Sequence, residues 1–150
     1  EIAEEREGTH RRERLLRMRK EAEEIMKALK EFNPRLVGSV WRGTARKGSD
    51  IDIIAFSQDC LQVLSQLQKH NFEVARTEQI SVTKEGEKES SFHIHIFFPS
   101  GDEAEVVVRS LITLGKQERC ETYGDIKTGL SLKQLTKVLK ENPVQKFVPI

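Results

Sequence analysis

The sequence predicts a single α/β (α+β) domain in which helices pack on a mixed sheet of about five strands. The 150 residues are enough to bury one core. Apolar periodicity is helical near both ends of the chain and strand-like in the middle. No internal repeat, linker or low-complexity tract divides the sequence. We therefore expect one domain over residues 1–150, with a core at about 9–109 and a helical extension at 110–150.

The first predicted element is a long amphipathic helix over residues 9–32. Its apolar side chains recur at spacings of three and four, which places them on one stripe. The stripe consists of Leu15, Met18, Ala22, Ile25, Leu29 and Phe32, widened by Leu16 and Met26. Asn33-Pro34 ends the helix, because the residue before a proline avoids the helical conformation. The stripe fits a helix lying on its own sheet; a coiled-coil contact with a partner helix is the alternative.

Strand patterns surround one short helix in the middle of the chain. Residues 60–70 have the helical pattern, and Ser131 is a typical N-cap for a final helix that reaches about residue 140. Polar turns at 84–87 and 99–102 favour antiparallel neighbours. The expected strands are 35–39, 51–56, 72–83, 91–98 and 103–109.

Charge and cysteine content narrow the class of protein. The 25 Lys and Arg residues nearly balance 24 Asp and Glu residues, so the net charge of +1 argues against a generally basic surface but not against a local basic groove. Cys60 and Cys120 lie far apart without C-x-x-C pairing, unlike a zinc ribbon or a disulfide scaffold. No apolar run reaches the length of a membrane span, and no signal peptide is evident. We expect a cytoplasmic protein with no membrane partner.

Two aspartates stand at the start of the apolar strand 51–56. Asp50 and Asp52 are two positions apart, so strand periodicity places both carboxylates on one face and Ile51 and Ile53 on the other. Like charges on one face repel unless a cation lies between them, and carboxylate oxygens suit Mg²⁺ or Mn²⁺. Two such ions about 3.5–4 Å apart can hold the attacking and leaving oxygens of a phosphoryl or nucleotidyl transfer.

A possible phosphate-binding segment precedes the acidic pair. Gly38 permits close approach of a ligand to the backbone, and Ser39 offers a hydroxyl and an amide as donors. A helical turn at 40–43 would direct N–H groups at an anion. The basic residues of the same loop are Arg42, Arg46 and Lys47. The stretch thus combines the chemistry of a phosphate cradle with that of a metal site.

Residues 36–56 resemble a family signature. The pattern is similar to the signature of the DNA polymerase β-like nucleotidyltransferase superfamily. It consists of an apolar residue, Gly38-Ser39, a spacer of about ten residues and Asp50-Ile51-Asp52. With Arg42-Gly43-Thr44 and Gly48-Ser49, the string resembles the catalytic head of archaeal-type CCA-adding tRNA nucleotidyltransferases and the small minimal nucleotidyltransferases. The resemblance implies a nucleotidyltransferase fold, with a matching element order over residues 15–109.

The resemblance also implies a third carboxylate on a later strand. Glu103 and Glu105 share one face of strand 103–109, while Ala104 and Val106 take the other. Glu105 abuts the apolar run and is assigned the role, with Glu103 next. The family usually has aspartate here, so the glutamate is a departure. Its longer side chain would still reach a metal or take a proton from an incoming hydroxyl; a catalytically slack domain is the other interpretation.

The implied activity is the Mg²⁺-dependent transfer of an NMP from an NTP such as ATP to an acceptor hydroxyl, with release of pyrophosphate; Mn²⁺ is a possible substitute. The implied catalytic and metal-binding residues are Asp50, Asp52 and Glu105, and the implied nucleotide-binding residues are Gly38, Ser39, Arg42 and Lys47. RNA, a small molecule or a protein could be the acceptor. The alternative is a weak or inactive nucleotidyltransferase-fold protein that acts as a regulatory, antitoxin-like partner of a helical protein. A homodimer or the head of a larger enzyme also fits.

Three further residues have both a functional and a structural interpretation, and the two cysteines have only a structural one. His93 and His95 face one way on strand 91–98, either as metal or substrate contacts near the acids or as the polar outer face of a strand. Trp41 either stacks on a nucleobase or packs in the core. Cys60, like Cys120, has no evident catalytic partner and is interpreted as structural.

Overall fold

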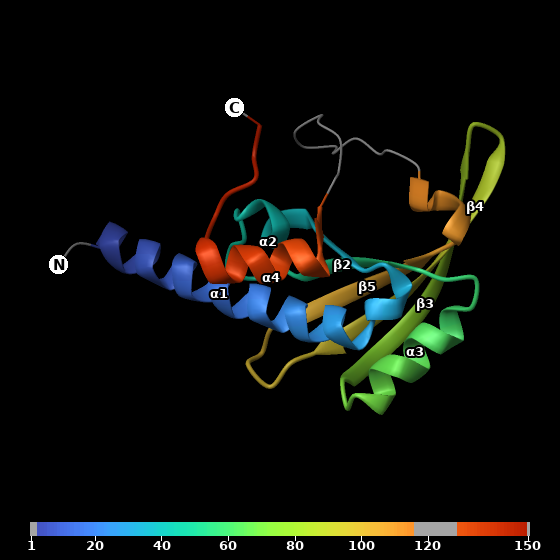
Figure 1. The fold of residues 1–150 in the computed structure, drawn as a ribbon, viewed down its shortest axis with the longest axis horizontal. Helices are drawn as coiled ribbons and strands as arrows, with labels where there is room; N and C mark the ends of the chain where they lie inside the picture. Colours follow the sequence, from blue (N-terminus) through green and yellow to red (C-terminus); the bar gives the residue numbers. More distant parts are fainter. Residues whose placement is uncertain (1–2, 116–128, 150) are drawn as a thin grey trace.

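Helices pack on one six-stranded mixed sheet in the computed structural model, which describes residues 3–115 and 129–149 (Figure 1). The strand order is β3-β4-β5-β2-β1-β6. Strands β2 and β5 pair in parallel, and the other neighbours are antiparallel. In chain order the elements are α1 (Ala3–Ala28), the 3-10 turn η1 (Lys30–Phe32), β1 (Arg35–Val37), α2 (Gly38–Arg42), β2 (Ile51–Phe56), α3 (Cys60–Lys69), β3 (Glu73–Lys84), β4 (Glu87–Phe97), β5 (Glu103–Arg109), the 3-10 turn η2 (Leu111–Gly115), β6 (Leu130–Ser131) and α4 (Leu132–Glu141). The predicted α+β class is confirmed.

Helix α1 lies on the domain's own core. The predicted stripe is buried from Leu15 to Leu29, and Phe32 packs against it from η1. The helix is longer at its start than predicted, and its first turns extend beyond the sheet (Figure 1). Because the apolar stripe is used inside the molecule, it does not offer a coiled-coil surface to a partner.

The sheet has one buried face and one more open face. In β2, Ile51 and Ile53 are fully buried, whereas Asp52 on the opposite face is half-buried. The same alternation runs through β5, where Ala104 and Val106 are buried and Glu105 is half-buried. Period-two alternation therefore keeps the apolar side chains under the helices and leaves carboxylates on the open face.

The hairpin of β3 and β4 is longer than predicted. Its ladder continues to the pair Lys84 and Glu87, around a turn in which Glu85 and Gly86 have φ values of 51° and 80°. Two consecutive residues with positive φ match the right-handed twist of the strands on either side. The outer part of the hairpin is exposed, so main-chain hydrogen bonding rather than burial extends the strands.

The end of the described chain belongs to the same core. Ser131 caps α4 through a capping box with Gln134, as its sequence position predicts. Leu135 and Val138 of α4 join the core cluster, and β6 adds a sixth strand beside β1. No periodicity could have shown this two-residue strand, because it consists of a few hydrogen bonds to β1.

Two smaller points complete the fold. Cys60 is a free, half-buried thiol at the start of α3, and Cys120 lies outside the described residues. Among the helices that the structure describes, none has the length and apolarity needed to cross a membrane.

Candidate active site

Asp52 lies where β1, β2 and β5 meet. It is the second residue of β2, opposite Val37 of β1 on one side and Glu105 of β5 on the other. Asp50 is exposed and directly precedes the strand. The sequence placed the carboxylates of this segment away from Ile51 and Ile53, and the burial pattern of β2 follows that expectation for Asp52.

Gly38 closely approaches the Asp52 carboxylate. Its φ of 76° lies in the left-handed region, and a Cβ added here would lie 2.5 Å from Asp52 Oδ2. Both the conformation and the space therefore require glycine. Gly38 also begins the short helix α2, which confirms the helical turn expected after the glycine. The glycine thus lets the turn with Ser39 sit directly against a carboxylate.

Glu105 is the neighbour of Asp52 across the parallel β2–β5 pair. Glu103 and Glu105 share the open face of β5, as the period of two predicts. Partial burial, and then the negative charges of Glu103 and Glu105, raise the pKa of Asp50, while His95 opposes the rise. Asp50 therefore lies within electrostatic range of the two glutamates. Mutual repulsion of this kind is what a bound cation would relieve.

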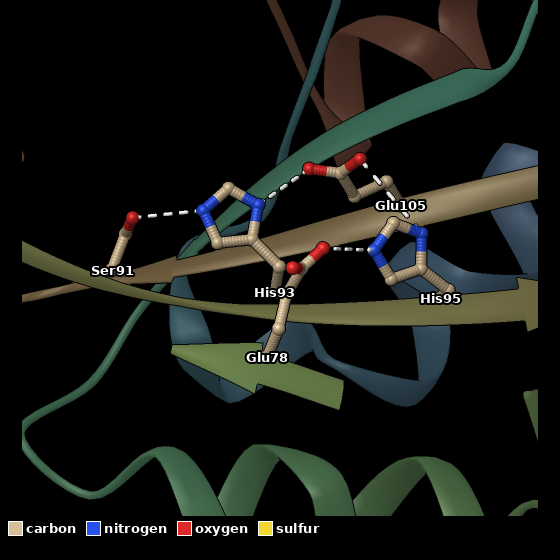
Figure 2. A network of polar contacts seen from close by, with 5 residues as sticks. All are labelled: Glu78, Ser91, His93, His95 and Glu105. Carbon is tan, nitrogen blue, oxygen red and sulfur yellow. Dashed lines mark hydrogen bonds and ion pairs between the residues drawn. The ribbon is translucent and has the colours of Figure 1, made fainter. Parts of the chain in front are cut away.

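Two histidines of β4 contact the presumed third acid of the resemblance, Glu105 (Figure 2). Its Oε1 lies 2.6 Å from His93 Nδ1, and its Oε2 lies 3.9 Å from His95 Nδ1. Since a carboxylate accepts only, His93 Nδ1 donates to Glu105, and His93 Nε2 lies 2.9 Å from the Ser91 hydroxyl. His95 Nε2 lies 3.3 Å from Glu78 Oε1 on β3.

His93 and His95 therefore lie on the polar outer face of a strand and also contact an acidic residue. They stand on the outer face of β4, opposite the buried Ile94 and Ile96. They also reach the carboxylate of the neighbouring strand, because β4 pairs with β5 in the register His93↔Val107 and His95↔Glu105. The contact depends on strand order, which the alternating sequence pattern does not reveal.

The chemistry of the donor set fits a hard divalent cation. Asp50, Asp52 and Glu105 supply oxygen only; Asp52 and Glu105 are paired on adjacent strands, and Asp50 directly precedes β2. Within residues 3–115 and 129–149, however, no three or more His, Cys, Asp or Glu side chains are arranged as a metal-binding group. The first contact of Glu105 is with His93, so a metal would compete with that imidazole for the carboxylate.

The basic residues of the loop after Ser39 differ in burial. Arg42 is 3% exposed, its guanidinium stacks 4.4 Å from the ring centre of Trp41, and Nη1 donates to Phe147 O at 3.1 Å. Trp41 is itself 4% exposed, in agreement with the core interpretation. Lys47 is exposed, and Ser39 is half-buried in α2. Burial thus separates Arg42 from Lys47, although both were expected to bind nucleotide.

Arg19 is a buried residue that the sequence interpretation missed. Its side chain is fully buried and donates to the carbonyls of Val40 and Trp41 at 3.0 and 2.9 Å. It also donates to Pro143 O at 2.9 Å and Gln145 O at 2.6 Å. Burial lowers the pKa of Arg19 to about 10.

The signal for this burial was present in the helical periodicity. Arg19 lies four residues after Leu15 and three before Ala22, which puts it on the buried stripe of α1. Its charged end is satisfied by backbone carbonyls of α2 and of the segment after α4. Arg19 therefore fixes the turn that carries Gly38 and Ser39 against α1.

Several solved structures match part of this chain at low sequence identity. Among solved structures, Cid1, an RNA terminal uridylyl transferase, is 17% identical with a TM-score of 0.47, over 64% of this chain and 30% of its own. A cytoplasmic RNA terminal U-transferase is 18% identical with a TM-score of 0.37, over 67% and 28%. The GLD-2/RNP-8 complex is 19% identical with a TM-score of 0.40, over 71% and 39%.

The chain thus spans about a third of the length of these structures. No curated protein matches the sequence. One family model, described as "Domain of unknown function (DUF4269)", matches residues 20–115, which is more than half of the chain and includes Asp50, Asp52, Glu103 and Glu105. The chain belongs to this family of proteins with a domain of unknown function.

Proposed function

We propose that the open face of the sheet is the active site of a nucleotidyltransferase. The reaction would transfer an NMP from an NTP to an acceptor hydroxyl and release pyrophosphate. The observation that carries the proposal is the position of Asp52, which lies against Gly38 and beside Glu105. From the family resemblance of residues 36–56 we expect a glycine-serine turn and three acidic residues. The positions of Gly38, Asp52 and Glu105 support this expectation, with two of the acids on adjacent strands.

Each residue of the proposed site has a role in binding or proton transfer. Asp50, Asp52 and Glu105 would hold Mg²⁺, with Mn²⁺ as a substitute, and the metal would neutralise phosphate charge and orient the reacting oxygens. Gly38 and Ser39 would hold the β- and γ-phosphates, with Lys47 as a cation nearby. We leave Arg42 out of the nucleotide site, because its guanidinium is buried against Trp41 and Phe147.

Glu105 has the position of a proton acceptor. It is half-buried at the junction of β2 and β5, and His93 orients its carboxylate through a short hydrogen bond. A carboxylate held beside Asp52 could take the proton of an acceptor hydroxyl as the new P–O bond forms. The chain would supply positioning and charge, which are the main requirements of phosphoryl and nucleotidyl transfer.

The test is product formation from radiolabelled NTPs with Mg²⁺ or Mn²⁺. We expect Asp52→Asn to lower transfer by about 10²-fold or more, because several kcal/mol of charge stabilisation is lost. Glu87→Gln, which removes an exposed carboxylate at the outer end of the hairpin, is the matched control. Thermal unfolding should show that both variants remain folded. Transfer at the wild-type rate by Asp52→Asn would rule out this site.

A catalytically weak regulatory protein is the second candidate. The observation that favours it is the 2.6 Å contact of His93 with Glu105, which occupies an oxygen that the metal would need. This candidate predicts no product with any NTP and no metal-dependent stabilisation by NTPs. The partner would have to bind elsewhere than the apolar stripe of α1, since that stripe is buried.

A further inference from the structure

Two adjoining cavities lie beside the start of α1, outside the carboxylate site. The larger has a volume of about 500 Å³ and lies between α1, the loop after α2 and the segment after α4. The smaller, of about 310 Å³, lies between α1 and the same loop. Arg11 and Arg46 line both, so the two cavities adjoin, and we call them together the basic recess.

Cations from three separate segments line the basic recess. The larger cavity is lined by Arg11 and Arg12 of α1, Arg46 of the loop and Lys146 of the last segment. The smaller cavity adds Arg14 and Lys47. Among the described lining residues, the larger cavity has no acidic side chain and the smaller has Glu7 alone. A chain with a net charge of +1 therefore concentrates positive charge here.

The walls of the recess are held in place by hydrogen bonds. Phe147 N donates to Arg42 O at 2.8 Å, which ties the last segment to the end of α2. Gly43 is packed so closely that an added Cβ would lie 3.0 Å from Gln145 O. The fully buried Arg19 bridges both segments from α1. The cations are therefore presented by a preformed surface.

The chemistry of the recess selects phosphate groups. Arginine forms paired hydrogen bonds with phosphate oxygens, and four of the six cations are arginines. Among the described residues that line either cavity there is no Phe, Tyr or Trp, and the one ring is the imidazole of His10 in the smaller cavity. Contacts would therefore be mainly with the backbone of a polyanion and would depend little on base sequence.

We propose that the basic recess binds the phosphate backbone of a single-stranded polynucleotide, which serves as the acceptor in the reaction. This inference rests on the proposed function. The loop that lines the recess at Gly43–Lys47 continues directly to Asp50 and β2. The residues that would bind the polynucleotide are thus close in sequence to the proposed metal ligands. Cations spread over two cavities fit several phosphates of a strand better than the single triphosphate of a nucleotide.

Fluorescence anisotropy with short labelled oligonucleotides tests the proposal. We expect oligo(U), oligo(A) and DNA of the same length to bind similarly, because the backbone is recognised. If four cations each contact one phosphate, the slope of log K against log salt is about −2.8, or about 50-fold weaker binding for a fourfold rise in salt. The double variant Arg11→Gln/Arg46→Gln should reduce the slope to about −1.4 and weaken binding.

The matched control removes two charges elsewhere. Lys69 on α3 and Lys88 on β4 are exposed and far from the recess in the chain, so Lys69→Gln/Lys88→Gln should keep the wild-type slope. Equal binding by the two double variants would overturn the proposal. Binding of inorganic triphosphate or anionic vesicles at the same sites, without binding of the strand, would overturn it as well.

A further variant separates this inference from the proposed function. Asp52→Asn should bind the strand as well as the wild type does, even though it is inactive. Strand binding by a wild-type protein that makes no product with any NTP would contradict the activity and leave the recess as a binding site. If Arg11→Gln/Arg46→Gln transferred NMP to a polynucleotide with the same KM for that acceptor as the wild type, the proposed role of the recess would be contradicted. The proposed activity would stand.

Discussion

Gly38 and Asp52 form the contact on which the proposed site depends most directly. The glycine adopts a φ of 76°, and no other residue has room beside Asp52 Oδ2. A side chain at this position would displace the carboxylate or the turn that carries Ser39. The geometry of the site is therefore sensitive to the smallest substitution at a single residue.

We expect Gly38→Ala to lower both stability and nucleotide binding. The left-handed conformation costs alanine about 1 kcal/mol, and the overlap with Asp52 adds to this cost. Gly48→Ala is the control, because Gly48 has a φ of 88° but nothing within 4 Å of an added Cβ. Denaturant unfolding and the thermal shift with Mg²⁺ and NTP measure the effects. Equal losses in the two variants would mean that only backbone strain matters at Gly38.

At the scale of elements, α1 is joined to α2 and to the segment after α4 by one buried arginine. Arg19 donates to four carbonyls that belong to these two segments. Each carbonyl would lose its partner if the guanidinium were removed, and an unsatisfied buried polar group costs about 1–3 kcal/mol. The placement of α2, and with it the Gly38-Ser39 turn, depends on this residue.

Arg19→Met should therefore destabilise the protein by about 3 kcal/mol or more, since several carbonyls lose their donor together. Arg19→Lys keeps the charge but offers only three donors from one atom, so we expect a loss of intermediate size. Lys20→Met, on the exposed side of the same helix, is the control. Chemical unfolding measures the three values. A loss in Arg19→Met no larger than that in Lys20→Met would show that the carbonyl contacts contribute little.

At the scale of the whole molecule, charge is separated although the total is +1. The open face of the sheet gathers Asp50, Glu103 and Glu105, and the basic recess lies at the start of α1. A second acidic cluster ties α1 to the turn between β4 and β5. There Arg17 binds Asp102 at 2.7 and 2.9 Å.

Glu21 completes this second cluster as a buried acid. Ser100 donates to its Oε2 at 2.6 Å, while its Oε1 is buried without a partner among the described residues. Burial and a hydrogen bond shared with Asp102 raise the pKa of Glu21 to about 7. Arg17 lowers the pKa of Asp102 to about 2. A proton on Glu21 Oε1 could be shared with Asp102, which would satisfy the otherwise unpaired oxygen.

These shifts predict opposite effects of pH on stability. Because the folded pKa of Glu21 is raised, its contribution is full below about pH 4.5 and is lost as pH rises towards 7. Because the pKa of Asp102 is depressed, its contribution is present above pH 3.8 and is lost as pH falls to about 2. This cluster is thus most stabilising between these limits, near pH 4–5.

Glu21→Gln should remove the loss at higher pH. We expect its melting temperature to match the wild type near pH 4.5 and to exceed it at pH 8 by several degrees, from a difference on the order of 2 kcal/mol. Glu24→Gln, at an exposed position of the same helix, should follow the wild-type curve. Melting curves from pH 4 to 8 test this, and parallel curves for Glu21→Gln and wild type would contradict it.

Local sequence patterns are enough to predict the class of the fold and the faces of its strands. Leu15, Ile53 and Val106 are buried where periodicity placed them, because the side-chain direction of helices and strands follows from local backbone geometry. The same geometry placed Asp52 and Glu105 away from the core. Their roles in nucleotidyl transfer stay predictions until activity is measured.

Which of these side chains meet depends on how the strands and helices assemble. Strand order brought Glu105 next to Asp52 and to His93, and packing turned Arg42 inward while Arg46 faced the arginines of α1. Such contacts join residues far apart in the chain, and their partners depend on sheet order and helix placement rather than on local spacing. The local pattern therefore set which face a residue takes, and the assembled fold set what that face contacts.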